Sequence, residues 1–148
     1  WQQTQFILSR CKAVPIDFEK LRPKQTVPPS GRAQFLHGDC VPGNLLETDR
    51  GLLLIDWQCP SIGDPSEDIA VFLSPAMQSI YRGMMLTAQQ IREFLDAYPE
   101  PKIINQYQLL APWYHLRMAA YCIWKTEQGV EAYRIGLEAE LEQMGLAV

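Results

Sequence analysis

Residues 37–44 read His-Gly-Asp-Cys-Val-Pro-Gly-Asn, and they hold the most informative group of polar side chains in this chain of 148 residues. Asp39 and Asn44 are separated by four residues, and Asp56 follows twelve residues after Asn44, where the apolar run 52–55 ends. A proline and a glycine within the loop allow the backbone to reverse sharply, which would turn both side chains toward one point. The pattern predicts a polar loop and then a β-hairpin that returns Asp56 alongside it.

A carboxylate, an amide and a second carboxylate in this order suit phosphoryl transfer. That reaction needs one group that orients the acceptor hydroxyl and takes its proton, and it needs oxygen ligands that hold Mg²⁺ against the nucleotide phosphates. In protein kinases these groups come from an HRDxxxxN loop and a later Asp. The corresponding residues here are His37, Asp39, Asn44 and Asp56.

Three motifs in order make the chain similar to a known family. The loop HGDCVPGN is followed by Ile-Asp-Trp at 55–57 and by Gly-Asp-Pro-Ser-Glu-Asp-Ile-Ala at 63–70. From about Phe35 to Phe72 the chain therefore resembles the aminoglycoside phosphotransferase and choline kinase family of protein-kinase-like enzymes, which shows HGDxxxxN, IDW and GDPxxDIA in this order. An ordinary protein kinase is disfavoured because Gly38 replaces the arginine of HRD and Trp57 replaces the phenylalanine after the metal-binding Asp.

The resemblance implies an ATP- and Mg²⁺-dependent phosphotransferase that acts on a hydroxyl of a small molecule. Asp39 would be the catalytic base, Asn44 and Asp56 the metal ligands, and His37 and Asp68 a supporting shell around the loop. Aminoglycosides, choline or ethanolamine, homoserine and similar compounds are all compatible acceptors. The residues that bind the acceptor are left unassigned.

Each candidate also has a purely structural interpretation. Asp39 could cap a turn, and Asn44 and Asp56 could be ordinary turn and strand-end residues, although a carboxylate that closes an apolar strand needs a partner for its charge. Asp64 is interpreted as a helix N-cap. Cys40 is interpreted as a structural thiol, since no histidine lies at a spacing that would activate it.

The rest of the pattern is mostly helical. The predicted fold class is α+β, mostly α, in the form of the C-terminal lobe of a protein-kinase-like fold with a small β-hairpin plus four or five helices. The expected strands are 34–36, 44–48 and 52–57, with a tight turn at 49–51. The expected helices are the end of one within 1–13, then about 64–73, 87–97, 103–121 with a kink or break at Pro112, and 127–144.

Length alone favours one domain. We expect residues 1–148 to form a single C-terminal catalytic lobe, with 14–33 as a surface connection, 34–57 as the catalytic loop and metal-binding hairpin, and 64–148 as a helical substrate-side subdomain. Neither a glycine-rich phosphate-covering loop nor a strand lysine precedes the catalytic loop. The expectation is therefore a lobe whose N-terminal nucleotide-covering partner is missing, in agreement with a first residue that is not Met.

Charge and composition disfavour other classes. A net charge of -4 and a pI of about 5.1 argue against nucleic acid as a partner. The four cysteines form no CxxC pair, which favours free thiols in a reducing compartment. The sequence shows neither a long apolar run nor a signal peptide, so we expect a cytoplasmic protein without a membrane partner. The alternative function is a non-catalytic kinase-like module that binds a metabolite or a protein partner.

Overall fold

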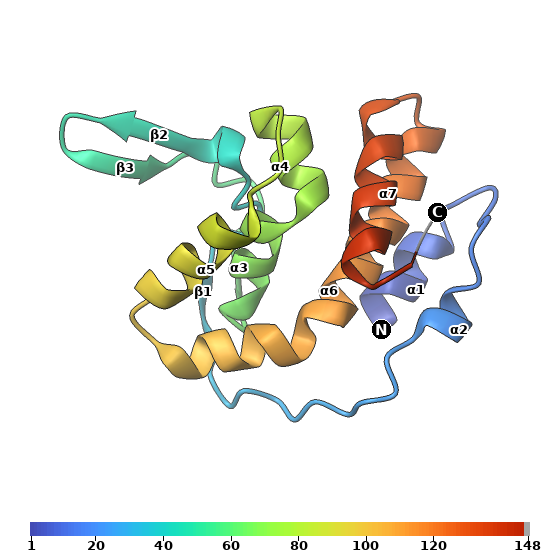
Figure 1. Cartoon of the computed structure of the whole chain (residues 1–148), viewed down its shortest axis with the longest axis horizontal. Coiled ribbons are helices and arrows are strands. Elements are labelled where there is room, and N and C mark those ends of the chain that lie inside the picture. Colours follow the sequence, from blue (N-terminus) through green and yellow to red (C-terminus); the bar gives the residue numbers. More distant parts are fainter. Residues whose placement is uncertain (147–148) are drawn as a thin grey trace.

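A computed structural model describes residues 1–146, and Figure 1 shows a β-hairpin that projects from a body of packed helices. The described residues form seven α-helices, which confirms the predicted α+β, mostly α class although four or five helices were expected. The helices are α1 Gln2–Leu8, α2 Phe18–Leu21, α3 Ser66–Leu73, α4 Pro75–Arg82, α5 Ala88–Ala97, α6 Pro101–Glu127 and α7 Ala132–Gln143. The strands are β1 Gln34–Leu36, β2 Leu45–Thr48, β3 Gly51–Leu54 and β4 Ser61–Gly63, and a 3-10 turn spans Pro42–Asn44.

The predicted hairpin is present. Strands β2 and β3 pair antiparallel with Leu45 opposite Leu54 and Thr48 opposite Gly51. Gly51 has φ 108°, a value that glycine adopts without strain, so the turn lies where the sequence placed it. Strand β3 ends at Leu54, earlier than predicted, because Asp56 has φ 62° and this left-handed conformation cannot continue a strand.

A second small sheet was not predicted. Strand β4 pairs antiparallel with β1, so that Phe35 lies opposite Ile62 and Gln34 opposite Gly63. This pairing brings the start of α3 back beside the strand that leads into the catalytic loop. Only three residues form β4, which is too short a run to show an alternating pattern in the sequence.

Local capping signals explain the starts of the helices after the hairpin. Pro65 rather than the predicted Asp64 is the N-cap residue of α3, and the Asp64 carboxylate, one residue earlier, accepts a hydrogen bond from the Ser66 backbone N–H at 3.0 Å. Thr87 and Gln90 form the predicted capping box of α5. Helix α4 was missed, although Ser74 caps it and Pro75 occupies its first turn.

Helix α6 is continuous through Pro112, so the proline does not break it. Figure 1 shows that α6 changes direction near its middle and then runs behind α7, as expected for a helix with an internal proline. The predicted start of the last helix was wrong, because Glu127 is the last residue of α6 and Gly129, with φ 87°, turns the chain before α7.

The core attaches the catalytic loop to three helices. Val41, in the middle of the loop, is almost fully buried against Ala76 of α4, Cys122 of α6 and Tyr133 of α7. Two further clusters lie under α1 and α2 and between α3, α5 and α6. An apolar residue of the core, Val41, therefore anchors the polar loop to the helices.

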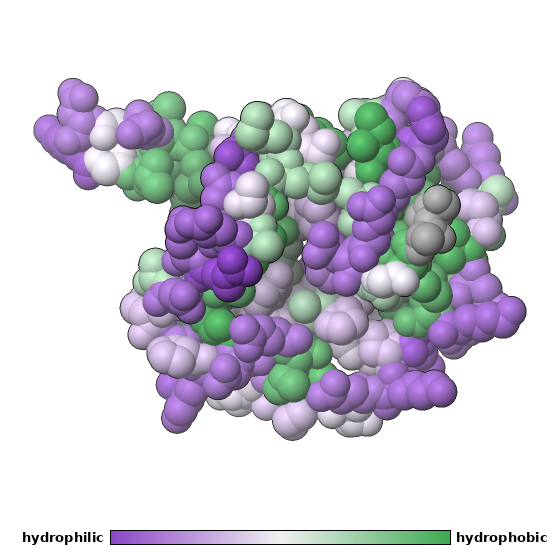
Figure 2. Space-filling view, viewed as in Figure 1, coloured by the Kyte–Doolittle hydropathy of each residue, from purple (hydrophilic) through white to green (hydrophobic). Residues whose placement is uncertain are grey.

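Two surface segments complete the description. Residues 14–33 are mostly exposed, but the single turn of α2 buries Phe18 in the core. The hairpin and the edge beside it expose apolar side chains, and Figure 2 shows green residues along the hairpin behind a purple tip. No helix in the described part of the chain is both long enough and apolar enough to cross a membrane.

Candidate active site

The loop brings Asp39 and Asn44 together. The Asn44 side chain is buried, and its Nδ2 donates to the backbone carbonyl of Asp39 at 2.8 Å and to the Asp39 carboxylate at 3.2 Å. These bonds occupy the amide N–H groups and leave the Asn44 Oδ1 as the free acceptor of the side chain. One amide thus fixes the direction of the proposed base and presents an oxygen of its own.

Asp56 is brought to the same loop by the backbone. The Ile55 N–H donates to the Asn44 carbonyl at 2.9 Å, so Asp56 follows directly after the point where the two segments are joined. Asp56 is exposed and its carboxylate accepts from Gln58 Nε2 at 2.6 Å. Its φ of 62° is uncommon for a residue with a Cβ and costs on the order of 1 kcal/mol. Such strain is typical of positions where the direction of a side chain matters.

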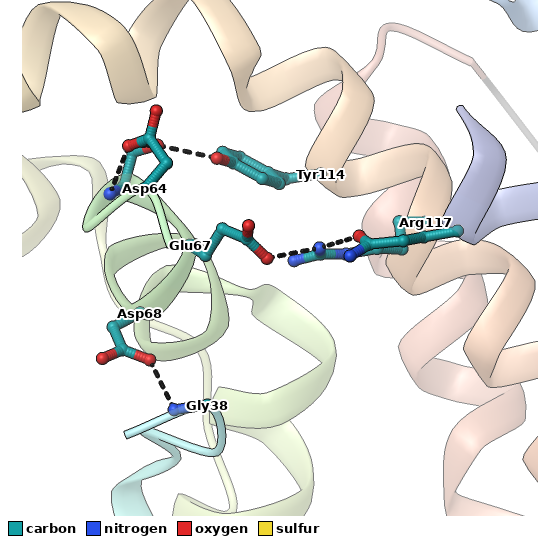
Figure 3. Close-up of polar contacts among 8 residues, drawn as sticks. Gly38, Asp64, Glu67, Asp68, Tyr114 and Arg117 are labelled. Atoms are coloured by element: carbon teal, nitrogen blue, oxygen red, sulfur yellow. Dashed lines mark hydrogen bonds and ion pairs between the residues drawn. The ribbon is translucent and has the colours of Figure 1, made fainter. Parts of the chain in front are cut away.

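Asp68 holds the loop from α3. Its two carboxylate oxygens accept from the backbone N–H groups of His37 at 2.7 Å and Gly38 at 2.9 Å, and Figure 3 shows the second of these bonds. Gly38 has φ 78°, and a Cβ there would lie 2.1 Å from the carbonyl oxygen of Cys59. The loop at this position therefore requires glycine for two separate reasons.

His37 lies inside the molecule rather than in the site. It is 1% exposed, its Nε2 lies 2.9 Å from the Ile55 carbonyl, and its Nδ1 accepts from the Asp39 N–H at 3.3 Å. The Trp57 ring meets it edge-on with 4.5 Å between ring centroids. The imidazole joins the loop to the segment that carries Asp56, which is what a scaffold residue does.

The donor set fits Mg²⁺ better than a transition metal. In the described residues no three His, Cys, Asp or Glu side chains come together as a metal site. Asn44 and Asp56 instead offer one amide oxygen and one carboxylate, and Mg²⁺ is commonly held by one or two such ligands together with water and substrate phosphates. These two ligands can hold Mg²⁺ only if phosphate oxygens and water fill its remaining coordination positions.

Cys40 does not provide a nucleophile. The thiol is partly buried, and this burial, together with the charges of Asp68 and Asp39, raises its pKa to about 11. A thiol with that pKa stays protonated at neutral pH and is a poor nucleophile. The structural interpretation of Cys40 agrees with its surroundings.

Asp39 also faces a cavity of about 740 Å³, which we call the inner cavity. Its walls come from helices far apart in the sequence and were not foreseen, because no motif or spacing connects them. One lining residue is Tyr81, whose ring lies so close to Gly43 that a Cβ on this glycine would approach the ring to 2.8 Å. Among the other lining residues are Phe6, Leu36, Glu67, Asp68, Met77, Arg117, Tyr121 and Tyr133.

One protein family matches the chain. The match is to APH, the phosphotransferase enzyme family, over residues 7–107. No curated protein and no solved structure matches the chain. The matched range is more than half of the chain and includes the catalytic loop, the hairpin, both small sheets and α3. The chain therefore belongs to the APH phosphotransferase enzyme family.

Proposed function

We propose that this chain carries the catalytic centre of an ATP- and Mg²⁺-dependent kinase that phosphorylates a hydroxyl group of a small molecule. The observation that carries the proposal is the Asn44 amide, which holds the Asp39 carboxylate and leaves its own oxygen free beside the backbone link to Asp56. Family membership supports phosphotransfer in general. The donor, the metal and the acceptor are the proposed part.

Asp39 is the proposed catalytic base. Its carboxylate accepts the proton of the acceptor hydroxyl while that oxygen attacks the terminal phosphate of ATP, and the hydrogen bond from Asn44 keeps the carboxylate turned toward the cavity. Asp68 acts through the loop backbone and touches no reacting atom. His37 likewise keeps the loop in register with the segment that holds Asp56.

Asn44 and Asp56 are the proposed Mg²⁺ ligands. Bound Mg²⁺ supplies positive charge against the phosphate oxygens and favours departure of the nucleoside diphosphate. The described residues place no Lys or Arg in an ion pair with Asp39 or Asp56. Carboxylates without such a partner suit a cation-binding role.

The acceptor is proposed to bind in the inner cavity, which contains Asp39. Aromatic rings from α1, α4, α6 and α7 line the cavity, so it suits a compact molecule with apolar surface next to the reacting hydroxyl. The faces of these rings also attract ammonium groups, and an aminoglycoside, choline or ethanolamine, homoserine or a similar compound carries such a group beside its hydroxyl. No residue of the cavity selects one of them.

A nucleotide-covering lobe outside this sequence is part of the proposal. The hairpin and the β1–β4 edge expose large apolar side chains, with Leu52 at 69%, Ile62 at 70% and Phe35 at 64% exposed. Apolar surface of this kind, gathered on one side of the molecule, is typical of a face that another domain covers. We expect this chain to be the C-terminal lobe and the covering lobe to supply the remaining contacts to ATP.

The decisive test is Mg²⁺-dependent ATP hydrolysis without an added acceptor, measured on the protein that includes the covering lobe. Water then stands in for the unknown hydroxyl. We expect slow hydrolysis by the wild type, loss of at least about tenfold in Asp56→Asn, and no change in Asp49→Asn, which makes the same substitution in the exposed hairpin turn. Equal, negligible rates in all three proteins, without Mg-ATP binding, would favour the non-catalytic binding module.

A further inference from the structure

A second cavity lies next to the inner one and shares a wall with it. This outer cavity measures about 990 Å³ and is lined by the segment 19–27 and by Leu110, Trp113 and Tyr114 of α6. Three residues line both cavities: Gln3, Glu67 and Arg117. What separates the two spaces is therefore a layer of these three side chains, which we call the bridge.

The bridge is formed by polar contacts between three helices. Arg117 of α6 donates from Nη1 to a carboxylate oxygen of Glu67 on α3 at 2.9 Å, and the same nitrogen donates to the side-chain oxygen of Gln3 on α1. Figure 3 shows Glu67 and Arg117 reaching toward each other, with Asp64 and Tyr114 on one side and Asp68 and Gly38 on the other. The bridge thus stands between the catalytic loop and the aromatic face of α6.

The bridge is not what holds α3 against α6. The Ser66 and Tyr114 hydroxyls are 2.6 Å apart, and an apolar cluster that includes Ile69 and Ile104 fills the space between the helices. The side chains of Arg117 and Glu67 are 19% and 34% exposed, and partly exposed ion pairs contribute little to stability. The pair lies between two cavities and is not the main contact between α3 and α6, so it has room for another role.

We propose that the bridge is a specificity determinant, which confines the acceptor to the inner cavity while it is closed. The outer cavity is then an extension subsite for an aromatic or apolar group of a longer acceptor, reached when Glu67 and Arg117 separate. This proposal rests on the proposed function only in placing the reacting hydroxyl beside Asp39. Glu67 and Arg117 touch the acceptor or exclude it, and they take no part in proton transfer.

Charged and polar side chains make up much of the lining of the outer cavity, and its aromatic part, formed by Trp1, Trp113 and Tyr114, is the surface that such a group needs. Trp113 and Trp1 meet edge-on with ring centroids 6.3 Å apart, and the Arg22 guanidinium lies 5.1 Å from the centroid of Trp1 and 6.0 Å from that of Trp113. Burial has also raised the pKa of Tyr114, on the same wall, to about 12. An aromatic ring placed here packs on indole and phenol faces and removes apolar surface from water.

The test is a binding experiment that needs neither ATP nor turnover. Calorimetric titrations compare a long probe, phenylhexanol, with a short one, phenylethanol, on the wild type, Arg117→Ala, Trp113→Ala and the double variant of both. We expect Arg117→Ala to bind phenylhexanol about tenfold more tightly than the wild type does, and Trp113→Ala to remove this gain in the double variant. Phenylethanol should bind equally to the wild type and Arg117→Ala, because it does not reach the outer cavity.

Controls separate the proposal from a loss of structure. Glu67→Ala opens the bridge from α3 and should act like Arg117→Ala, so the test survives if one variant fails to fold. Arg134→Ala removes the exposed pair with Glu131, which lines neither cavity, and should change nothing. An unchanged affinity for phenylhexanol in both bridge variants, or an equal effect of Trp113→Ala with and without Arg117, overturns the proposal. Failure of the proposed function appears separately, as absent Asp56-dependent hydrolysis.

Discussion

At the scale of single residues, the site is organised around backbone positions rather than around side chains alone. Asp39 and Asn44 face each other because the loop reverses between them, and the backbone bond from Ile55 to Asn44 joins the segment that carries Asp56 to this loop. Asp68 then binds two backbone N–H groups of the same loop with one carboxylate. The N–H of the buried His37 would be left without its acceptor if Asp68 were removed, at a cost of about 1–3 kcal/mol, whereas water can reach the N–H of the exposed Gly38.

Gly38 offers a sharp test of this arrangement. Gly38 and Gly31 both have positive φ, at 78° and 67°, but a Cβ on Gly31 meets nothing within 4 Å, whereas one on Gly38 would collide with the Cys59 carbonyl. We expect Gly31→Ala to lower the free energy of unfolding by about 1 kcal/mol and Gly38→Ala by at least about 3 kcal/mol, because backbone strain and collision add. Urea denaturation of both variants measures the difference, and equal losses would show that the loop moves away from Cys59 at little cost.

The residues of the loop were predictable because their chemistry is local. His37, Asp39 and Asn44 fall within one motif, and Asp56 and Asp68 follow in two more. In the structure Asn44 is bonded to Asp39 and Asp68 to the loop backbone, and the catalytic and metal-binding roles of these residues stay predictions. The lining of the inner cavity was not predictable, because its rings come from α1, α4, α6 and α7 and meet only after those helices pack.

At the scale of helices and strands, predictions succeeded where residues adjacent in the sequence form a cap or a turn. The hairpin turn and the capping box of α5 are examples. Helix α4 was missed although it is as long as α3, because it begins directly after α3 ends, and because part of what fixes its first turn comes from elsewhere. That part is the buried Glu140 carboxylate of α7. It accepts hydrogen bonds from the Ser74 hydroxyl and from the Ala76 N–H at 3.2 Å, and it lies 2.6 Å from His115 Nδ1.

Glu140 should therefore be a major determinant of the packing of α4 on α7. It is 0% exposed, and its removal leaves a backbone N–H, a hydroxyl and an imidazole without their partner. We expect Glu140→Ala to lower the free energy of unfolding by at least about 3 kcal/mol, and Glu142→Ala, an exposed position on the same helix, to change it by less than about 0.5 kcal/mol. Chemical denaturation followed by circular dichroism measures both, and similar values for the two would contradict this role.

At the scale of the whole molecule, the two ends of the proposed site differ in how they are enclosed. Helices from both halves of the sequence surround the acceptor side, where the inner cavity lies. On the hairpin side, every residue from 51 to 60 is exposed, including the segment that carries Asp56. A chain that buries the loop through Val41 yet exposes the hairpin is enclosed on the proposed acceptor side and open on the proposed nucleotide side.

The uncovered side makes a prediction that concerns association rather than stability. Leu52 on the hairpin and Ile62 on β4 are among the most exposed apolar side chains of the described residues, so a polar replacement removes no core contact. We expect this chain on its own to self-associate through the uncovered side, and we expect Leu52→Lys and Ile62→Lys to weaken that association in analytical ultracentrifugation. Both substitutions should change the free energy of unfolding by less than about 0.5 kcal/mol. Leu109→Lys, at a 41% exposed position on α6, should leave association unchanged. If all three variants behave alike, the hairpin face has no special affinity for a covering surface, and the proposed second lobe loses its main structural support.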